Sequence, residues 1–464
     1  MTSSGFVQIT PRSRPNGTVP PAVLSAPASP ASPYVPQMHL FNVDERPYLL
    51  LANGSQIFEI EDDIYAGLDR ARKGRDRQNV DSMLARLGLD GAPLIEDEAP
   101  ASFPVRALSL SVAQKCNLGC TYCYAQEGTF GDAPQDMTVE AAEGSLDLLF
   151  RDAAPGERLN LSFLGGEPLI NRALIQTVTR RAAERAKLQN VHIGFSITTN
   201  GTLLKPQDAE FFEEHGFAVT ISLDGVGEDH DRLRPFKSGA ESYERIIANV
   251  RPLLAAQRQM QVSARVTVTP QNLDLVGTLD TLIGMGFHSV GFSPMLSSPT
   301  GRAEMDAATL ETMLSQMILC GEKFEQRLSE GVRYPFSNMT NALREIHKGT
   351  HRPYPCGAGA GYMGVSADGG LFACHRFVGD DAGRMGDVSA GVDLIAQKDW
   401  LAGRHVHTQE PCSGCWARYL CGGGCHHEVI NRGRAACDYI RGWLHYCLQA
   451  YIRTLSARPD YFGA

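Results

Sequence analysis

The sequence predicts an α/β protein whose largest part is a parallel sheet. Six apolar, strand-like runs stand between residues 105 and 300, at 105–112, 158–164, 191–198, 217–223, 260–268 and 287–293. Helical periodicity fills most of the gaps, over 138–152, 172–188, 206–215, 242–257 and 273–285. Repeated βα units form a parallel sheet, curved into a barrel or open, with functional loops at the carboxyl ends of the strands. A cysteine loop follows the first strand, at the expected end.

Length and composition restrict the class of protein. A chain of 464 residues suits about two to four domains, and its 43% apolar and 20% charged residues are ordinary for a globular protein. The net charge of −9 gives no general attraction to nucleic acid or to an anionic membrane, so we expect neither as a partner. No long apolar run and no secretory signal are present, which predicts a cytoplasmic location.

The first hundred residues divide into two parts. Residues 1–37 are rich in Ser, Pro and Ala and are predicted to be a disordered tail. Residues 38–98 hold three strand-like runs separated by turn residues, followed by two short amphipathic segments at 62–73 and 80–87. This order is typical of a small winged-helix module whose sheet edge could accept a peptide strand. A simple cap on the next domain is the alternative.

The last part of the chain carries most of the cysteines. Residues 303–349 look helical, and residues 350–464 are rich in Gly and Cys with little periodicity. Nine of the twelve cysteines follow residue 300, and Cys320 is predicted to be a buried hydrophobe on a helix. In a chain without an export signal, clustered cysteines are more typical of metal ligands or catalytic groups than of disulfides.

Cys116, Cys120 and Cys123 form the most informative group. They follow the strand-like run at 105–112 at spacings of four and three residues. A structural zinc site is normally closed by four protein ligands, whereas a four-iron cluster held by three thiolates keeps one iron open to a substrate. The loop therefore favours an iron-sulfur cluster with a reactive iron. A zinc ribbon would leave this three-thiol loop unexplained.

With three further motifs, this loop resembles the signature of the radical S-adenosylmethionine (SAM) enzymes. The loop reads CxxxCxxC, and the ends of the next three strands carry Gly165-Gly166-Glu167-Pro168, Thr198-Thr199-Asn200-Gly201 and Ser222-Leu223-Asp224-Gly225. The resemblance implies a partial (β/α)6, TIM-like barrel. It also implies a [4Fe-4S] cluster whose open iron binds the methionine part of SAM, which is cleaved to a 5′-deoxyadenosyl radical.

The resemblance also implies which residues contact SAM. Gly165, Gly166, Glu167 and Pro168 would hold its amino group, and Thr199, Asn200, Ser222 and Asp224 would reach its ribose and carboxylate. Two arginines are further candidates for cofactor contact, with surface ion pairing as the alternative: Arg234 and Arg265.

The C-terminal cysteines resemble the SPASM extension of the same family, which binds two auxiliary four-iron clusters. The resemblance assigns one cluster to Cys412, Cys415, Cys421 and Cys437, and the other to Cys356, Cys374 and Cys425. No cysteine lies in 357–373, so the latter has three obvious ligands. Its fourth could be Cys447, a histidine such as His375 or His426, or the substrate. The chain is therefore expected to hold three [4Fe-4S] clusters and SAM.

Residues 38–41 and 59–63 extend the resemblance to maturases that install thioether cross-links in cysteine-containing peptides. It implies a peptide or small-protein substrate whose leader segment binds the N-terminal winged-helix module, and a low-potential electron donor such as flavodoxin or ferredoxin. The alternatives are a carbon-carbon cross-linking or formylglycine-forming maturase, or a non-enzymatic electron carrier or peptide-binding scaffold. The substrate, the bond and the oligomeric state are not predicted.

His375 bears on the formylglycine alternative and on the general base. It stands where the family's sulfatase maturases have an aspartate, which makes that alternative less attractive. A histidine there could accept a proton, or it could donate a hydrogen bond beside the cluster. With these assignments the predicted parts are a tail (1–37), a winged-helix module (38–98), a radical SAM barrel (99–302), a helical bridge (303–349) and a SPASM domain (350–464).

Overall fold

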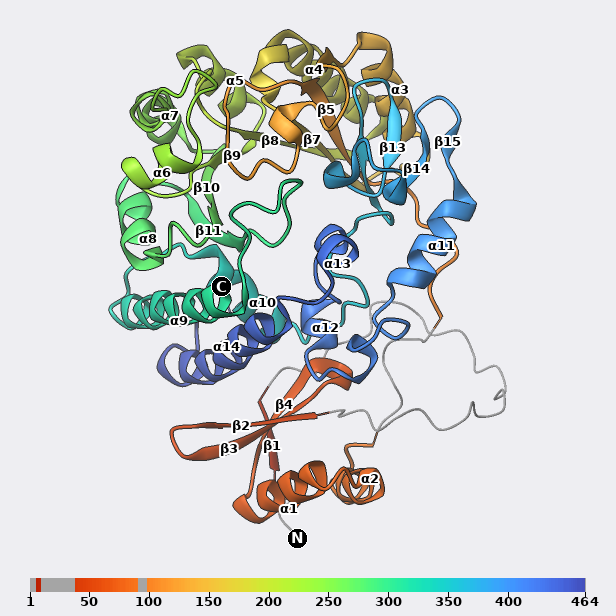
Figure 1. Cartoon of the computed structure of the whole chain (residues 1–464). Coiled ribbons are helices and arrows are strands. Elements are labelled where there is room, and N and C mark those ends of the chain that lie inside the picture. Colours follow the sequence, from red (N-terminus) through yellow and green to blue (C-terminus); the bar gives the residue numbers. More distant parts are fainter. Residues whose placement is uncertain (1–5, 10–37, 91–97, 464) are drawn as a thin grey trace.

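The computed structural model describes residues 6–9, 38–90 and 98–463 (Figure 1). Its main sheet has the strand order β11-β10-β9-β8-β7-β5-β12-β13-β14-β15, with β6 (Gln135–Asp136) paired to β5. The six strands from β11 to β5 are parallel, as the sequence predicts. Their bounds are β5 Ala107–Gln114, β7 Arg158–Gly165, β8 His192–Thr199, β9 Ala218–Ser222, β10 Gln261–Val268 and β11 Ser289–Pro294.

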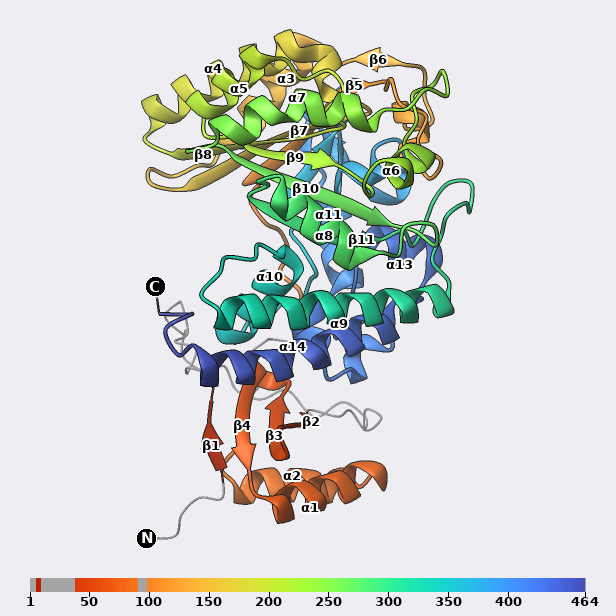
Figure 2. The same ribbon diagram turned by 90° about the vertical axis from the view of Figure 1, so that its left-hand side faces the viewer.

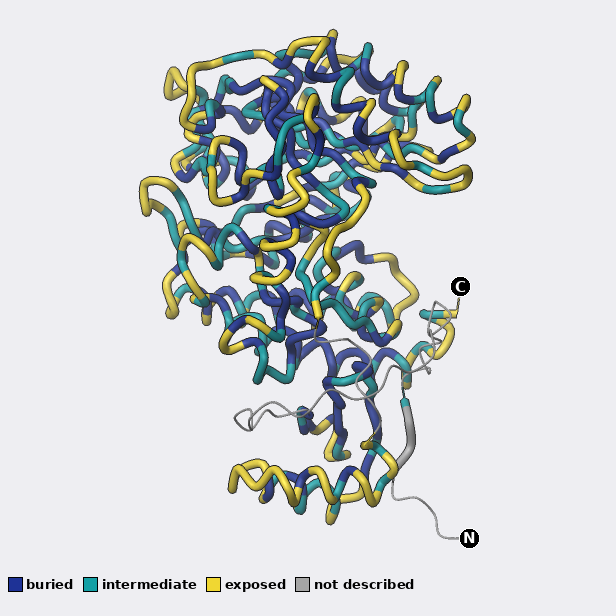
Figure 3. The backbone as a smooth tube through the Cα atoms, turned by 90° about the vertical axis from the view of Figure 1, so that its right-hand side faces the viewer, coloured by how far each residue is buried: buried dark blue, intermediate teal, exposed yellow. Residues whose placement is uncertain are grey.

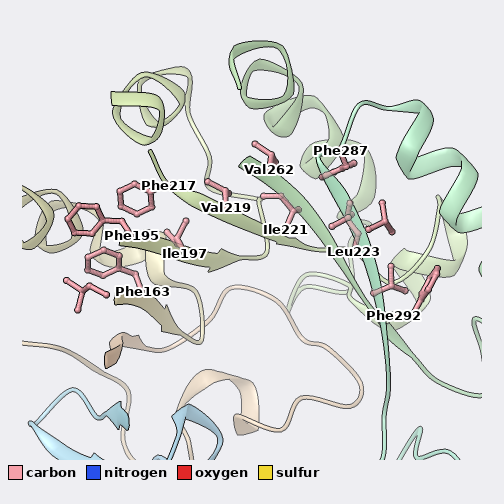
Figure 4. Close-up of a cluster of buried hydrophobic side chains, with 14 of the residues drawn as sticks. Phe163, Phe195, Ile197, Phe217, Val219, Ile221, Leu223, Val262, Phe287 and Phe292 are labelled. Atoms are coloured by element: carbon pink, nitrogen blue, oxygen red, sulfur yellow. The ribbon is translucent and has the colours of Figure 1, made fainter. Parts of the chain in front are cut away.

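Helices cover the outer face of this sheet, as Figures 1 and 2 show. They are α3 Val139–Phe150, α4 Arg172–Gln189, α5 Pro206–Glu214, α6 Glu228–Leu233, α7 Tyr243–Ala256 and α8 Leu275–Gly284. Side chains alternate along each strand, so β10 buries Val262, Ala264 and Val266 while Ser263 and Arg265 lie on the other face. The apolar side chains of successive strands meet in one core (Figure 4). The inner face is left polar.

The cysteine-rich region continues the same sheet. Strand β12 (Tyr362–Val365) pairs in parallel with β5, matching Tyr362 to Ala107, and an antiparallel series follows it: β13 Gly370–Phe372, β14 Arg384–Asp387 and β15 Gly391–Val392. The expected boundary at residue 350 therefore does not interrupt the sheet. Helices complete this part: α9 Ala307–Ser329, α10 Ser337–His347, α11 Leu394–Arg404, α12 Arg418–Cys421, α13 His426–Arg432 and α14 Cys437–Ala457. Short 3-10 turns stand at 53–55, 126–128, 168–171, 375–377, 381–383 and 412–414.

The N-terminal module is a small antiparallel sheet covered by two helices. Its elements are β2 Met38–Val43, β3 Arg46–Leu51, β4 Gln56–Ile60, α1 Asp62–Lys73 and α2 Arg77–Arg86. A fourth strand, β1 (Phe6–Gln8), pairs with β4. The prediction of disorder is therefore wrong for residues 6–8, because a short β-prone run within the Ser/Pro-rich segment finds a free strand edge. The remainder of 1–37 lies outside the described residues.

Both faces of this small sheet are buried. Met38, Leu40 and Phe58 pack with α1 and α2, whereas Phe41 and Tyr48 belong to the main core. Figure 2 shows the sheet between α14 above and α1 and α2 below, and Figure 3 shows that the outer sides of those two helices are exposed. The module is thus joined to the body through an apolar interface.

No helix in the described part of the chain is both long and apolar enough to cross a bilayer.

Candidate active site

The loops that follow β5 and β7 are packed tightly against each other. A Cβ added at Gly166 would lie 2.4 Å from the carbonyl oxygen of Lys115, and one at Gly128 would lie 2.9 Å from Cβ of Cys116. The backbone N–H of Glu167 donates to the Lys115 carbonyl at 2.9 Å. Glycine is therefore required at 166 because the cysteine loop lies directly on this turn.

Cys116, Cys120 and Cys123 converge in that loop. Burial raises the pKa of the Cys120 thiol to about 12, and the neighbouring Cys123 and Cys116 thiols act in the same direction. A thiol with so high a pKa is stable as a thiolate only when a metal centre replaces its proton, so Cys120 fits a metal ligand. Asn200 Nδ2 lies 3.7 Å and the Leu118 backbone nitrogen 3.5 Å from Cys116 Sγ, as sulfur hydrogen bonds. The donor set fits an iron-sulfur cluster.

A single metal ion fits the cysteines less well. Across residues 6–9, 38–90 and 98–463, no three or more His, Cys, Asp or Glu side chains are arranged to hold one ion. Thiolates on one zinc stand about 3.8 Å apart, as follows from a Zn–S bond of about 2.3 Å in a tetrahedron. Cluster thiolates bind different irons and stand further apart than this.

Glu167 is fully buried beside the cysteine loop. Its carboxylate accepts hydrogen bonds from Thr199 Oγ1 (2.6 Å), from the Asn200 backbone (2.7 Å) and from the Leu169 backbone (3.1 Å). Burial raises the pKa of this carboxyl, and these three donors act against the rise. An ionised carboxylate has about four acceptor positions, so one remains for a ligand ammonium group. Asn117 links the cysteine loop to the hydrogen bonds around Glu167, since Asn200 Nδ2 donates to Asn117 Oδ1 at 3.0 Å.

Asp224, Tyr122 and Arg234 form a buried network below the same loop. Tyr122 donates a short hydrogen bond to Asp224 Oδ2, and Arg234 Nη1 donates to Tyr122 Oη at 2.7 Å. Arg234 also forms an ion pair with Asp224 at 3.5 Å, and its side chain is 11% exposed. The Thr267 backbone donates to Asp224 Oδ1 at 2.8 Å. Both carboxylate oxygens of Asp224 therefore contact groups within the protein. The ion pair of Arg234 is internal rather than on the surface.

The remaining candidates for SAM contact lie around this centre. Pro168 begins a 3-10 turn directly after Glu167. Ser222 and Arg265 are register partners on β9 and β10, and both are on the inner face of the sheet. Arg265 donates a short hydrogen bond to Ser293 Oγ. This residue reaches the inner face without touching the cysteine loop in any described contact.

A second group of thiols comprises Cys356, Cys374 and Cys425. Burial raises the pKa of the Cys374 thiol to about 12, and the neighbouring Cys425 and Cys356 thiols add to the effect. Cys447 is not part of this group: it is fully buried in the main core on α14, and its pKa is raised by burial and then by Glu325. The structure therefore brings three of the four candidate thiols together.

His375 and Arg376 connect this second group with the first. His375 Nδ1 lies 2.9 Å from Tyr362 Oη, and burial lowers the pKa of the imidazole to about 4. The guanidinium of Arg376 lies 5.2 Å from the Tyr124 ring centroid, and its Nη1 lies 3.8 Å from Cys425 Sγ. Because Tyr124 follows Cys123 in the chain, Arg376 stands between two groups of thiols. His426 is held elsewhere, accepting from Arg404 Nε at 3.1 Å.

A third group of thiols lines one pocket, to which α13 also contributes side chains. Its thiols are Cys412, Cys415, Cys421 and Cys437, and Cys425 also reaches the wall. Burial raises the pKa of Cys412 to about 11, with the other three thiols of the group contributing. Four arginines line the same pocket: Arg418, Arg432, Arg434 and Arg441. Four thiols in a cationic pocket fit a closed, anionic cluster.

Sequence reasoning missed four residues that tie these groups together. They are Asn117, Tyr124, Arg376 and Glu428, and Glu428 pairs with Arg376 at 2.7 Å. Asn117 and Tyr124 lie inside or directly after the cysteine motif, and Arg376 follows Cys374 by two residues. A polar residue next to a predicted ligand is the signal that could have identified them.

Comparisons with known proteins identify relatives of this chain. The sequence model of the Radical SAM superfamily matches residues 110–282. A serine-type anaerobic sulfatase-maturating enzyme of Bacteroides thetaiotaomicron is 30% identical over 379 residues, which cover 75% of this chain and 90% of that enzyme. The enzyme of the same name from Klebsiella aerogenes is 25% identical over 363 residues, covering 74% and 85%.

Two solved structures share the fold. One is anSMEcpe with bound AdoMet and Cp18Cys peptide, at a TM-score of 0.60 and 19% identity, covering 76% of this chain and 99% of that one. The other is Streptococcus suis SuiB bound to precursor peptide SuiA, at a TM-score of 0.51 and 17% identity, covering 85% and 95%.

Proposed function

Because the chain belongs to the radical SAM superfamily, we propose that it modifies a peptide or small protein by forming thioether cross-links. As a member of this superfamily it is an enzyme that binds S-adenosylmethionine and a [4Fe-4S] cluster. The thioether would join a cysteine sulfur to a carbon atom of another residue. Such links are made in the maturation of the quinohemoprotein amine dehydrogenase small subunit, whose maturase this sequence resembles.

Different residues would hold the first cluster and SAM. Cys116, Cys120 and Cys123 would hold the first cluster, and Glu167 would accept a hydrogen bond from the ammonium group of SAM. Asn200 contacts Glu167 through its backbone N–H and Cys116 through its side-chain amide, so it couples the SAM site to the cluster site. When bound, the cluster and SAM together supply a 5′-deoxyadenosyl radical that removes a hydrogen atom from the substrate.

The overall reaction balances without a further oxidant. Each thioether replaces one S–H and one C–H bond of the substrate, which loses two electrons and two protons. S-adenosylmethionine takes up both electrons and one proton when it is cleaved to methionine and 5′-deoxyadenosine, and the other proton is released. A low-potential donor such as flavodoxin or ferredoxin is needed to reduce the first cluster.

The observation that carries the proposal is the second group of thiols. Among the described cysteines, only Cys356, Cys374 and Cys425 are electrostatic neighbours of one another there, while Cys447 lies in the core. Three thiols leave one coordination position of a four-iron cluster without a protein thiolate. A substrate cysteine is the proposed occupant, since a metal-bound thiol is deprotonated and held in place for S–C bond formation.

His375 has a positioning role in this proposal. It contacts Tyr362 Oη, and Tyr362 is an electrostatic neighbour of both Cys374 and Cys356. We therefore assign His375 to hold Tyr362 against the second group. This contact carries the assignment, and it does not require His375 to exchange a proton with the substrate.

Formylglycine formation is the second candidate function. The sulfatase-maturating relatives, one of them 30% identical, favour it. His375 stands against it, because the sulfatase maturases that the sequence resembles have an aspartate at this place. Mass spectrometry of a peptide co-expressed with the protein separates the two. A thioether retains sulfur, loses two hydrogens and resists alkylation, whereas formylglycine gains a carbonyl group that reacts with hydrazides.

Cleavage of SAM tests the enzymatic class. Anaerobically reconstituted protein, reduced with dithionite and supplied with SAM, should release 5′-deoxyadenosine, and the Cys116→Ala variant should release none. An electron carrier or peptide-binding scaffold would release none in either form. That outcome would refute the proposed function.

Metal analysis tests the assignment of the thiols. Three clusters predict about twelve iron atoms per chain. Cys425→Ala should lower this content, whereas Cys447→Ala should leave it unchanged because Cys447 lies in the apolar core. Equal iron loss in both variants would contradict the open coordination position. As a direct probe, N-acetylcysteine amide should shift the paramagnetic signal of the second cluster, and N-acetylserine amide should not.

A further inference from the structure

The N-terminal module docks on three parts of the body. His39 of β2 stacks on Trp416 at 3.9 Å between ring centroids. Gln449 Nε2 of α14 donates to the Asn42 carbonyl at 2.9 Å. The turn 53–55 contacts α12, and Figure 1 shows α12 and α14 above the small sheet. The docking site of the module therefore includes Trp416, α12 and α14.

Each of these parts adjoins a thiol of the third group. Trp416 directly follows Cys415 in the chain. Helix α12 ends at Cys421, and α14 begins at Cys437. Three of the four thiols of the third group therefore belong to, or directly adjoin, the elements on which the module rests.

The segment before the second group of thiols also connects the module with α12. Ser55 Oγ donates to the Thr350 carbonyl at 2.8 Å. Two residues later, the Arg352 backbone donates to the Tyr419 carbonyl of α12 at 3.1 Å. The contact at Ser55 thus depends on the position of α12 as well.

The docking site has little regular structure of its own between the thiols. Helix α12 has four residues, far fewer than the roughly 12–15 that an isolated helix needs in water. Three glycines with positive φ follow it, Gly422 to Gly424, and ordering glycine costs more backbone entropy than ordering other residues. A cluster bound to the four thiols would cross-link α12, the start of α14 and the 3-10 turn at 412–414. Such metal binding contributes directly to the free energy of folding.

We propose that the third cluster controls the docking of the N-terminal module: the module is held on the body when the third group of thiols carries its cluster, and docking is weakened when the cluster is lost. The inference rests on the assignment of that cluster and not on the bond that the enzyme forms. Under the proposed function, a chain without the third cluster would hold its N-terminal module out of position. Assembly of the cluster would then also control how the substrate is captured.

Two sets of side chains report separately on docking and on folding of the module. Phe41 and Tyr48, 2% and 4% exposed, pack into the main core that the module shares with the body. Phe58, 2% exposed, packs with α1 and α2 in the module's own core. Undocking exposes the first two and leaves Phe58 buried, whereas unfolding of the module exposes all three.

Carbene footprinting, in which a photolysed diazirine labels exposed side chains, measures this difference on the full chain after anaerobic cluster reconstitution. Cys437→Ala should contain less iron than the natural protein. Its labelling of Phe41 and Tyr48 should rise at least about threefold, because the undocked form becomes populated, and that of Phe58 should stay unchanged.

Two variants that lose iron elsewhere are the matched controls. Cys116→Ala and Cys374→Ala remove thiols of the first and the second group, and both should keep the labelling of the natural protein. Increased labelling in these controls would overturn the proposal, because docking would then depend on iron content in general. A Cys437→Ala protein that keeps its iron, keeps its low labelling or exposes Phe58 as well would also overturn it.

Trp416 tests the path from the third group to the module. Trp416→Ala should keep the iron content of the natural protein and still raise the labelling of Phe41, because it removes the ring on which His39 stacks. Combined with Cys437→Ala it should add little, since the docking site is already weakened. Fully additive effects of the two changes would overturn the proposal, because Trp416 and the cluster would then act separately.

None of these measurements requires a substrate or the formation of 5′-deoxyadenosine. A protein that cross-links its substrate but keeps the module docked without the third cluster retains its proposed function and loses only this inference.

Discussion

The contact between Asp224, Tyr122 and Arg234 fixes the cysteine loop to the end of β9. Asp224→Asn should leave the buried Arg234 cation without a counter-charge, and removing one partner of a buried ion pair costs about 3–5 kcal/mol. Tyr122→Phe keeps the ion pair and loses hydrogen bonds, which costs roughly 1–3 kcal/mol. Urea unfolding of the two variants gives the order. A milder effect for Asp224→Asn than for Tyr122→Phe would contradict the internal role of the ion pair.

Arg376 lies between the first and the second group of cysteines. Its guanidinium contacts Cys425 Sγ and covers the Tyr124 ring. A cation and a hydrogen bond at a cluster sulfur favour the reduced, more negative cluster. Arg376→Gln should therefore lower one reduction potential, measured by redox titration with paramagnetic resonance. Arg384→Gln, which removes an exposed arginine over the Phe372 ring, is the control and should change no potential.

Single residues were predictable to different degrees. Cys116, Glu167 and Asn200 were identified from motifs, because ligand chemistry restricts both residue type and spacing. Cys447 matched the residue type of a fourth ligand, but its neighbours depend on how α14 packs on α9. Arg376 has no motif at all, since a guanidinium reaches over a large distance and its contacts depend on the tertiary structure.

At the scale of elements, the joint between β2 and α14 should respond to acid. His39 Nε2 lies 2.9 Å from His445 Nδ1, and burial lowers the pKa of His39 to about 3. A released imidazole titrates near its usual value of 6.5, so below that pH the released form binds a proton that the docked form does not. The docking free energy is complete above pH 6.5 and falls by about 1.4 kcal/mol per pH unit as the pH drops toward 3.

Amide exchange in β2 at pH 7.5 and 5.5, corrected for intrinsic rates, measures this response. Protection should decrease at the lower pH in the natural protein and in His192→Gln, where an exposed histidine is removed. Protection that is the same at both pH values would show that the two histidines do not couple docking to protons.

The six parallel strands and their helices were predicted within a few residues, because long apolar runs are bounded by turn residues. The short strands β12, β13, β14 and β15 were not predicted. Each has between two and four residues, too few for a period to be recognised, and β12 depends on β5, which lies about 250 residues earlier. Helix α6 was missed for a related reason, since it has six mostly charged residues.

At the scale of the whole molecule, the continuous sheet predicts how a shortened protein would behave. A chain that ends at residue 349 loses β12 and exposes the edge of β5, whose side chains from Leu108 to Gln114 are all buried. Such an apolar edge favours association between copies. Size-exclusion chromatography should find aggregates of this shortened protein, in contrast to the full chain. A stable monomer would show that the barrel is independent of the region after residue 349.

The shared sheet also restricts how the protein can evolve by recombination. Strand β5, which leads into the cysteine loop, pairs with β12, and β12 pairs with β13, which leads to Cys374, so one backbone ladder sets the spacing of the two cysteine sites. Recombination that exchanged the C-terminal part between two such enzymes would have to preserve the register of Tyr362 on Ala107. Under the proposed function, changes in side chains around the second group of thiols are therefore an easier route to new substrates than replacement of the whole C-terminal part.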